Sequence, residues 1–182
     1  MNTRSDTRSK IQAVALDLFG EQGYDKTSLR EIAERLGVTK AALYYHFKTK
    51  EEIVTSLFQA ADEGLQQLVA WTKDQEPTLE NRRELVRLYA RGISDGRAFK
   101  LMRLIQENQH TLRELAVSMR GQDRLEQLIA FMVDPGASLA AQLKARMSLI
   151  VMHAGMFALR EVESTPEERQ AAALEVALEL VG

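Results

Sequence analysis

The chain has 182 residues, of which 45% are hydrophobic and 27% are charged, and its net charge is −2. This composition is typical of a globular protein with a buried core, and the length suits a small domain followed by a medium one. The sequence contains no cysteine, which excludes a disulfide-framed secreted protein and thiolate chemistry and favours the reducing cytoplasm.

The hydropathy pattern predicts neither export nor a membrane anchor. The first ten residues are polar and charged and lack the apolar segment of a signal peptide. The longest apolar run, residues 147–159, contains a serine and a histidine and is shorter than the span of about 20 residues that a bilayer requires. We therefore expect a cytoplasmic protein with no membrane partner.

Charge is distributed unevenly along the chain. Residues 1–50 carry nine Lys and Arg against six acids, a net charge of +3, whereas residues 51–182 carry fifteen against twenty, a net charge of −5. A basic N-terminal segment followed by an acidic remainder is typical of a DNA-binding domain joined to a regulatory domain, because phosphate contacts supply much of the affinity for DNA.

The first predicted helix covers about residues 7–22. Its apolar stripe consists of Ile11, Ala15, Leu18 and Phe19, which recur at helical spacing. Tyr24 lies in the loop that follows, and we expect it to pack against this stripe.

Residues 27–50 predict two short helices joined by a tight turn. Thr27 and Ser28 can cap the first helix, and Ser28 with Glu31 has the spacing of a capping box. Gly37 follows the last apolar residue of that helix and is suited to the left-handed backbone that ends it. Thr39 caps the second helix, so the segment predicts a helix-turn-helix, which places its second helix in the major groove of DNA.

The side chains that remain outside this motif form a basic and aromatic surface. Thr39, Lys40, Ala41 and Tyr44 would face the bases, and the small side chain of Ala41 would let the helix approach closely. Tyr45, His46, Lys48 and Lys50 would suit phosphates.

The segment YDKTSLREIAERLGVTKAALYYHFKTKEEI, and more broadly residues 7–58, closely resembles the DNA-binding domain of TetR-type transcriptional regulators. The resemblance implies base or nearby phosphate contacts for Thr39, Lys40, Ala41 and Tyr44. It implies phosphate contacts for Thr27, Ser28, Tyr45, His46 and Lys50. At Ala41 and Ala42 some family members carry a polar residue, so the resemblance does not say which operator sequence is read.

The rest of the chain also reads as helices, with no strand pattern. The expected ranges are about 50–71, 78–92, 98–107, 111–132 with a kink or break near Gly121, 138–161 and 165–181. With the first three, this gives about nine helices and an all-α fold. We expect a helix-turn-helix domain over residues 1–50 and a helical effector-binding and dimerisation domain over residues 51–182.

The predicted helix 138–161 is apolar around most of its circumference, so one protomer is not expected to cover it. We therefore expect a homodimer formed by the last two helices. A twofold dimer places two recognition helices about 34–36 Å apart, which predicts a nearly palindromic operator.

The resemblance further implies a small-molecule effector, which we expect to be largely apolar. The candidate effector-binding residues combine apolar side chains with a few polar groups: Trp71, Met102, Gln106, Asn108, His110, Met119, Met152, His153 and Phe157. Trp71 could equally serve in packing between domains, and His153 could be a core residue, an interface hydrogen-bonding group or an effector contact.

No pattern in the sequence predicts catalysis. The three histidines lack partners at metal-ligand spacing, and phosphate loops and nucleophile motifs are missing, so we expect no metal, no cofactor and no enzyme activity. The leading hypothesis is a homodimeric repressor released from its operator by an effector. The alternative is a helical DNA-binding regulator without an inducer, controlled by a partner or associated with the nucleoid.

Overall fold

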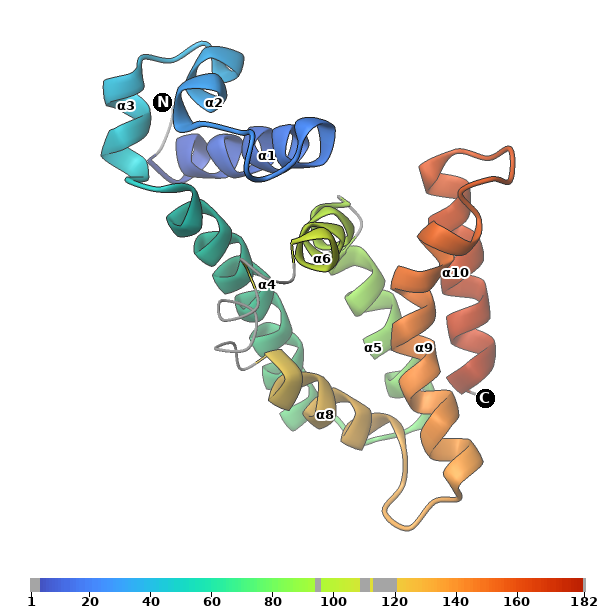
Figure 1. Ribbon diagram of the computed structural model, residues 1–182. Coiled ribbons are helices and arrows are strands. Elements are labelled where there is room, and N and C mark those ends of the chain that lie inside the picture. The colour runs from blue at the N-terminus through green and yellow to red at the C-terminus, as the bar shows by residue number, and fades with distance from the viewer. Residues whose placement is uncertain (1–3, 94–95, 109–111, 113–120, 182) are drawn as a thin grey trace. The chain divides into compact units, whose positions relative to one another are not determined.

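The computed structural model describes residues 4–93, 96–108, 112 and 121–181, and within these ranges all regular structure is helical (Figure 1). This confirms the predicted all-α fold. The helices are α1 (Arg4–Gln22), α2 (Leu29–Leu36), α3 (Lys40–His46), α4 (Lys50–Lys73), α5 (Leu79–Gly92), α6 (Arg97–Glu107), α8 (Gly121–Met132), α9 (Leu139–Ala158) and α10 (Pro166–Val181).

The chain forms two compact units that are interleaved in sequence. Unit 1 comprises residues 1–62 and 96–119, and unit 2 comprises residues 63–95 and 120–182. These packing units do not coincide with the predicted boundary at residue 50, because α6 packs on α1 and the first half of α4 contributes to the core of the N-terminal helices.

Unit 1 is built around the apolar faces of α1, α2 and α3. Ile11, Phe19, Ile32, Leu43 and Phe47 are each at most 1% exposed. The ring of Tyr24 lies 5.1 Å from that of Phe19 and is 2% exposed, as predicted for this loop residue.

The ends of α2 and α3 follow the predicted local chemistry. The Ser28 hydroxyl accepts from the Glu31 amide, and the Glu31 carboxylate accepts from the Ser28 amide at 2.7 Å. Gly37 ends α2 in the left-handed conformation with φ of 71°, and Thr39 caps α3 by accepting from the Ala42 amide. These caps fix where each helix of the motif begins and ends, and therefore which residues α3 exposes.

Unit 2 contains the second half of α4 with α5, α8, α9 and α10. The most extensive packing is between α9 and α10, which run side by side (Figure 1). They approach closely at Gly155, where a Cβ atom would lie only 2.9 Å from the Cβ of Ala173. Gly155 thus lets the two helices come together.

One face of α9 is apolar and exposed. Leu139, Leu143, Met147 and Ile150 are 83%, 59%, 37% and 50% exposed, and their spacing places them on one side of the helix. We call these four residues the α9 stripe. In the part of the chain that the structure describes, no helix is long and apolar enough to cross a membrane.

Candidate nucleic-acid interface

Helix α3 presents the predicted base-facing residues on its outer side. Thr39, Lys40 and Ala41 are exposed, whereas Tyr44 is half-buried and packs against the core of unit 1. The ammonium group of Lys40 lies 5.4 Å from the centre of the Tyr44 ring, which favours an ordered cation above an aromatic face. The structure therefore brings these four residues together at the start and middle of one short helix.

The predicted phosphate-contacting residues continue from the end of α3. Tyr45 is 63% exposed, and its ring meets the His46 imidazole edge-on at 5.3 Å. Lys48 is exposed, and its ammonium group donates to the Tyr44 carbonyl. Tyr45, His46 and Lys48 thus form an aromatic and basic edge beside the base-facing residues.

Thr27 and Ser28 differ from each other in placement. The Thr27 side chain is 2% exposed, and its hydroxyl donates to the Gly23 carbonyl at 2.8 Å. This geometry gives the Thr27 side chain a role in the fold and does not favour the predicted phosphate contact. Ser28 is exposed, but its hydroxyl is occupied in the cap of α2, where hydrogen bonds hold the pKa of Glu31 below its usual value.

Lys50 is also predicted to contact phosphate from an exposed position, but the structure places it differently. It is half-buried, and its ammonium group donates to the carbonyls of Tyr24 at 2.6 Å and Asp25 at 3.3 Å. The same group lies 4.4 Å from the centre of the Tyr24 ring. Lys50 is thus turned toward the α1–α2 loop of its own chain.

Sequence reasoning gave no role to Arg8, which the structure places against the end of α3. Its guanidinium donates to the His46 carbonyl at 3.1 Å and lies 4.2 Å above the Phe47 ring. No local pattern marks Arg8, because its partners are 38 and 39 positions away in sequence. It holds the last turn of α3 to α1.

The arginines of α2 are paired with acids. Arg30 and Glu34 form an ion pair at 2.7 Å, and Arg35 pairs with Glu21 of α1 at 2.9 Å. Both pairs are exposed, so each contributes little to stability. Because these guanidiniums already have carboxylate partners, the lysines of α3 and its C-terminal edge are the more available cations.

The predicted effector-binding residues are divided between the two units. In unit 2 the Trp71 and Phe131 rings meet at 6.0 Å, Met152 is buried and Phe157 is half-buried. His153 lies beside Tyr89 of α5, with 2.7 Å between the Tyr89 hydroxyl and His153 Nε2. Burial raises the pKa of Tyr89 to about 12 and lowers the pKa of His153, so both groups are uncharged at neutral pH and share this hydrogen bond.

The other effector candidates belong to unit 1 or lie outside the described residues. Gln106 is exposed, and the Asn108 amide donates to the Leu104 carbonyl at 2.9 Å at the end of α6. Met102 lies within α6, but its side chain is not described, and His110 and Met119 lie outside the described residues, as does the segment before Gly121 in which we expected a kink.

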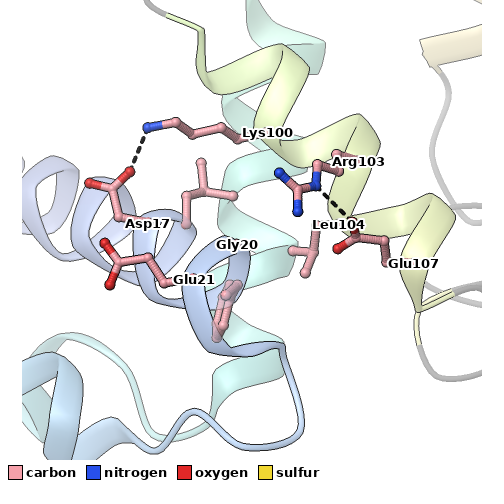
Figure 2. A pocket seen from close by; sticks show the side chains of 9 residues that line it. Asp17, Gly20, Glu21, Lys100, Arg103, Leu104 and Glu107 are labelled. Atoms are coloured by element: carbon pink, nitrogen blue, oxygen red, sulfur yellow. Dashed lines mark hydrogen bonds and ion pairs between the residues drawn. The ribbon is translucent and has the colours of Figure 1, made fainter. Parts of the chain in front are cut away.

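A groove of about 310 Å³ lies between α1 and α6 (Figure 2). Leu16, Phe19 and Leu104 line its apolar part, and the ion pairs Asp17–Lys100 and Arg103–Glu107 lie at its rim. None of the predicted effector residues lines this groove. Among the described residues there is also no cluster of three or more metal-ligating side chains.

Comparison with known proteins points to one family. The model of bacterial regulatory proteins of the tetR family matches residues 11–57, the span that holds α2, α3 and most of α1. The HTH-type transcriptional regulator AcrR of Shigella flexneri is 29% identical over 167 residues, which cover 86% of this chain and 77% of that protein. The negative regulator IcaR of the biofilm operon icaADBC in Staphylococcus epidermidis is 48% identical over 46 residues, 25% of each chain.

Solved structures show the same architecture beyond the N-terminal domain. AmtR of Mycobacterium smegmatis is 26% identical with a TM-score of 0.68, and the match covers 96% of this chain and 86% of AmtR. The fatty acid degradation regulator FadR of Bacillus halodurans matches in fold at 17% identity, with a TM-score of 0.70 over 99% of this chain and 97% of FadR. With its capped helix-turn-helix and its regulator relatives, the chain carries the N-terminal DNA-binding domain of the tetR family of bacterial transcriptional regulators, and it shares the helical architecture of these solved structures.

Proposed function

We propose that the chain is a homodimeric repressor that inserts α3 into the major groove of a nearly palindromic operator and leaves it when a small molecule binds. The observation that carries this proposal is the outer face of α3. There, the N-cap residue Thr39 provides a hydroxyl, Lys40 provides an ammonium group and Ala41 provides a small apolar side chain, and all three are exposed. Such a face allows close approach of the helix to base edges.

The roles of the individual residues follow from their placement. Thr39, Lys40, Ala41 and Tyr44 face the bases or adjacent phosphates, and Tyr45, His46 and Lys48 contact the phosphate backbone. Ser28 caps the start of α2, and its exposed position at the positive end of this helix suits a phosphate. Residues 1–50 act as the DNA-binding domain and residues 51–182 as the regulatory domain.

Repression is the mode of action that the relatives support. IcaR is named as a negative transcriptional regulator, and its similarity to this chain covers 46 residues. A bound dimer acts by occupying DNA that the transcription machinery needs.

The α9 stripe supports dimerisation through α9 and α10. Four large apolar side chains on one helix face are an unusual exposure for a single soluble protomer, and Val176 of α10, 43% exposed, adds to the apolar surface of this helix pair. Pairing of the two helices with their symmetry mates would bury the stripe in an isologous four-helix interface.

The effector-binding part of the proposal rests on unit 2. Trp71, Met152 and Phe157 offer apolar contacts, and the Tyr89–His153 pair offers a polar group in surroundings that are otherwise apolar. A largely apolar effector with one hydrogen-bonding group fits this composition.

The DNA-binding proposal is tested by selecting a duplex from a random-sequence pool with the wild-type chain and measuring affinity by fluorescence anisotropy over a range of salt concentrations. Lys48→Met should flatten the salt dependence by a slope of about 0.9 for each phosphate that is no longer neutralised. Repeating the selection with Lys40→Ala should yield a different preferred sequence, because this residue faces the bases.

Lys73→Met is the matched control, because Lys73 is an exposed lysine in the last turn of α4. It removes the same charge and should change neither the salt slope nor the selected sequence. The proposal fails if the wild-type chain enriches no duplex, or if Lys40→Ala and Lys48→Met both behave like Lys73→Met.

A further inference from the structure

Lys50 occupies a position that helix electrostatics alone would not assign to a lysine. It is the first residue of α4, where the positive end of the helix dipole favours acids such as the following Glu51 and Glu52. The cost of a cation there is offset by the carbonyls of Tyr24 and Asp25 and by the Tyr24 ring. The lysine is therefore explained by its contacts with the α1–α2 loop.

The residue after Lys50 holds the other end of the same tyrosine. The Tyr24 hydroxyl donates to the Glu51 carboxylate at 2.8 Å. Burial, together with this carboxylate, raises the pKa of Tyr24, so the hydroxyl stays protonated and remains a donor. Lys50 thus contacts the backbone carbonyl and the ring of Tyr24, and Glu51 accepts from its hydroxyl. Tyr24 itself is 2% exposed.

The loop that contains Tyr24 leads directly into the helix-turn-helix. The Thr27 amide donates to the Tyr24 carbonyl at 3.3 Å, and the next residue, Ser28, caps α2. The same turn of α4 is tied to the segment that follows α3, because the Lys48 amide donates to the Glu52 carboxylate at 2.7 Å. The first turn of α4 therefore holds both the entrance to α2 and the exit from α3.

We propose that Lys50 and Glu51 form a clasp on Tyr24 that positions the helix-turn-helix for DNA, and that Lys50 acts through this clasp and not as a phosphate ligand. This inference rests on the proposed function of α3. A phosphate would have to draw the ammonium group away from two carbonyls and a ring face. Lys48, two residues away, is exposed, and its ammonium group donates to a single carbonyl.

The clasp predicts that loss of Lys50 lowers the fraction of protein in the competent conformation. Apparent affinity falls in proportion to that fraction. For Lys50→Met we expect about tenfold weaker binding to the selected duplex, equivalent to about 1.4 kcal/mol, with a salt slope equal to that of the wild type. Lys48→Met, the matched control, removes the same charge two residues away and should flatten the slope.

The Tyr24–Glu51 half of the clasp gives tests in which the two proteins compared carry the same charge. Tyr24→Phe removes only a buried hydroxyl and should weaken DNA binding with an unchanged salt slope. Glu51→Gln keeps an acceptor for this hydroxyl and should bind more tightly than Glu51→Ala, which carries the same charge. The double variant Tyr24→Phe, Glu51→Ala should be no weaker than Glu51→Ala alone, because both changes break one hydrogen bond.

Hydrogen exchange of residues 23–28 gives a readout that does not involve DNA. Exchange should accelerate in Lys50→Met and Tyr24→Phe and should stay unchanged in Lys48→Met. If Lys50→Met does not fold, as judged by its circular dichroism, then Tyr24→Phe and the two Glu51 variants decide the question.

Two results would overturn the clasp. One is a salt slope in Lys50→Met as shallow as that in Lys48→Met, which would make Lys50 a direct phosphate ligand. The other is DNA affinity within twofold of the wild type in both Lys50→Met and Tyr24→Phe. If the wild-type chain selects no duplex, the proposed function itself fails, and unchanged loop exchange in Lys50→Met would then reject the clasp separately.

Discussion

Replacing Gly155 by alanine should force α9 and α10 apart. The new Cβ would lie 2.9 Å from the Cβ of Ala173, whereas carbon atoms in good contact are about 3.5–4.0 Å apart. Neither atom belongs to a flexible side chain, so the two helices must give by roughly 0.6–1.1 Å. Overpacking of this kind typically costs about 1–3 kcal/mol.

Gly64→Ala is the matched control for this prediction. Gly64 also lies inside a helix, but a Cβ there would meet nothing within 4 Å. Both substitutions gain about 1 kcal/mol of helix propensity, so the difference in stability between the two variants isolates the cost of the clash. At about 2–4 °C per kcal/mol for a chain of this size, Gly155→Ala should melt roughly 2–12 °C below Gly64→Ala.

Thermal unfolding followed by circular dichroism at one fixed protein concentration measures this difference, because the stability of a dimer depends on concentration. The double variant Gly155→Ala, Ala173→Gly moves one methyl group from α10 to α9 and leaves the propensity terms balanced. It should recover a melting temperature close to that of the wild type. Equal melting temperatures for Gly155→Ala and Gly64→Ala would refute the reasoning.

Three further outcomes are expected. Leu143→Glu with Ile150→Glu should convert the proposed dimer to a monomer in light scattering at micromolar concentration. Val162→Glu, at an equally exposed valine outside α9, should not; a dimeric double variant would contradict the interface. Burial lowers the pKa of His153 from 6.5, so the unfolded chain binds a proton that the folded chain resists, and stability is lost as pH falls below about 6.5. The melting temperature should therefore fall less between pH 7.5 and 5.5 in His153→Gln than in the wild type, and an equal fall would contradict the burial of a neutral imidazole. An effector that weakens DNA binding 100-fold must itself bind about 100-fold more weakly to the DNA complex, a coupling of about 2.7 kcal/mol; calorimetric titrations with equal affinity in the presence and absence of the selected duplex would show an uncoupled site.

The features that could be predicted from the sequence are those governed by neighbours in the chain. The Ser28–Glu31 box, the left-handed Gly37 and the Thr39 cap each depend on residues within about four positions, so their chemistry is visible in the sequence. The position of α3, and the exposure of Lys40 and Tyr45 on it, follow from those caps.

The features that could not be predicted depend on partners far apart in sequence. Lys50 meets loop carbonyls 25 and 26 positions away, and the orientation of its ammonium group depends on how α4 meets the α1–α2 loop. Thr27 reads as an exposed cap because threonine suits that role, but the loop turns its hydroxyl back to the Gly23 carbonyl. The packing of α6 on α1 likewise has no signature in either helix alone.

The course of α4 through both compact units has a mechanical consequence. Gly64 lies two residues beyond the end of the first segment of unit 1, in the interior of a continuous 24-residue helix. A glycine makes its helical turn less stable than an alanine would by about 1 kcal/mol, so this turn has the weakest intrinsic helix propensity in α4. A helix bends most easily where a turn is weak, so we expect Gly64→Ala to stiffen α4 as well as stabilise it.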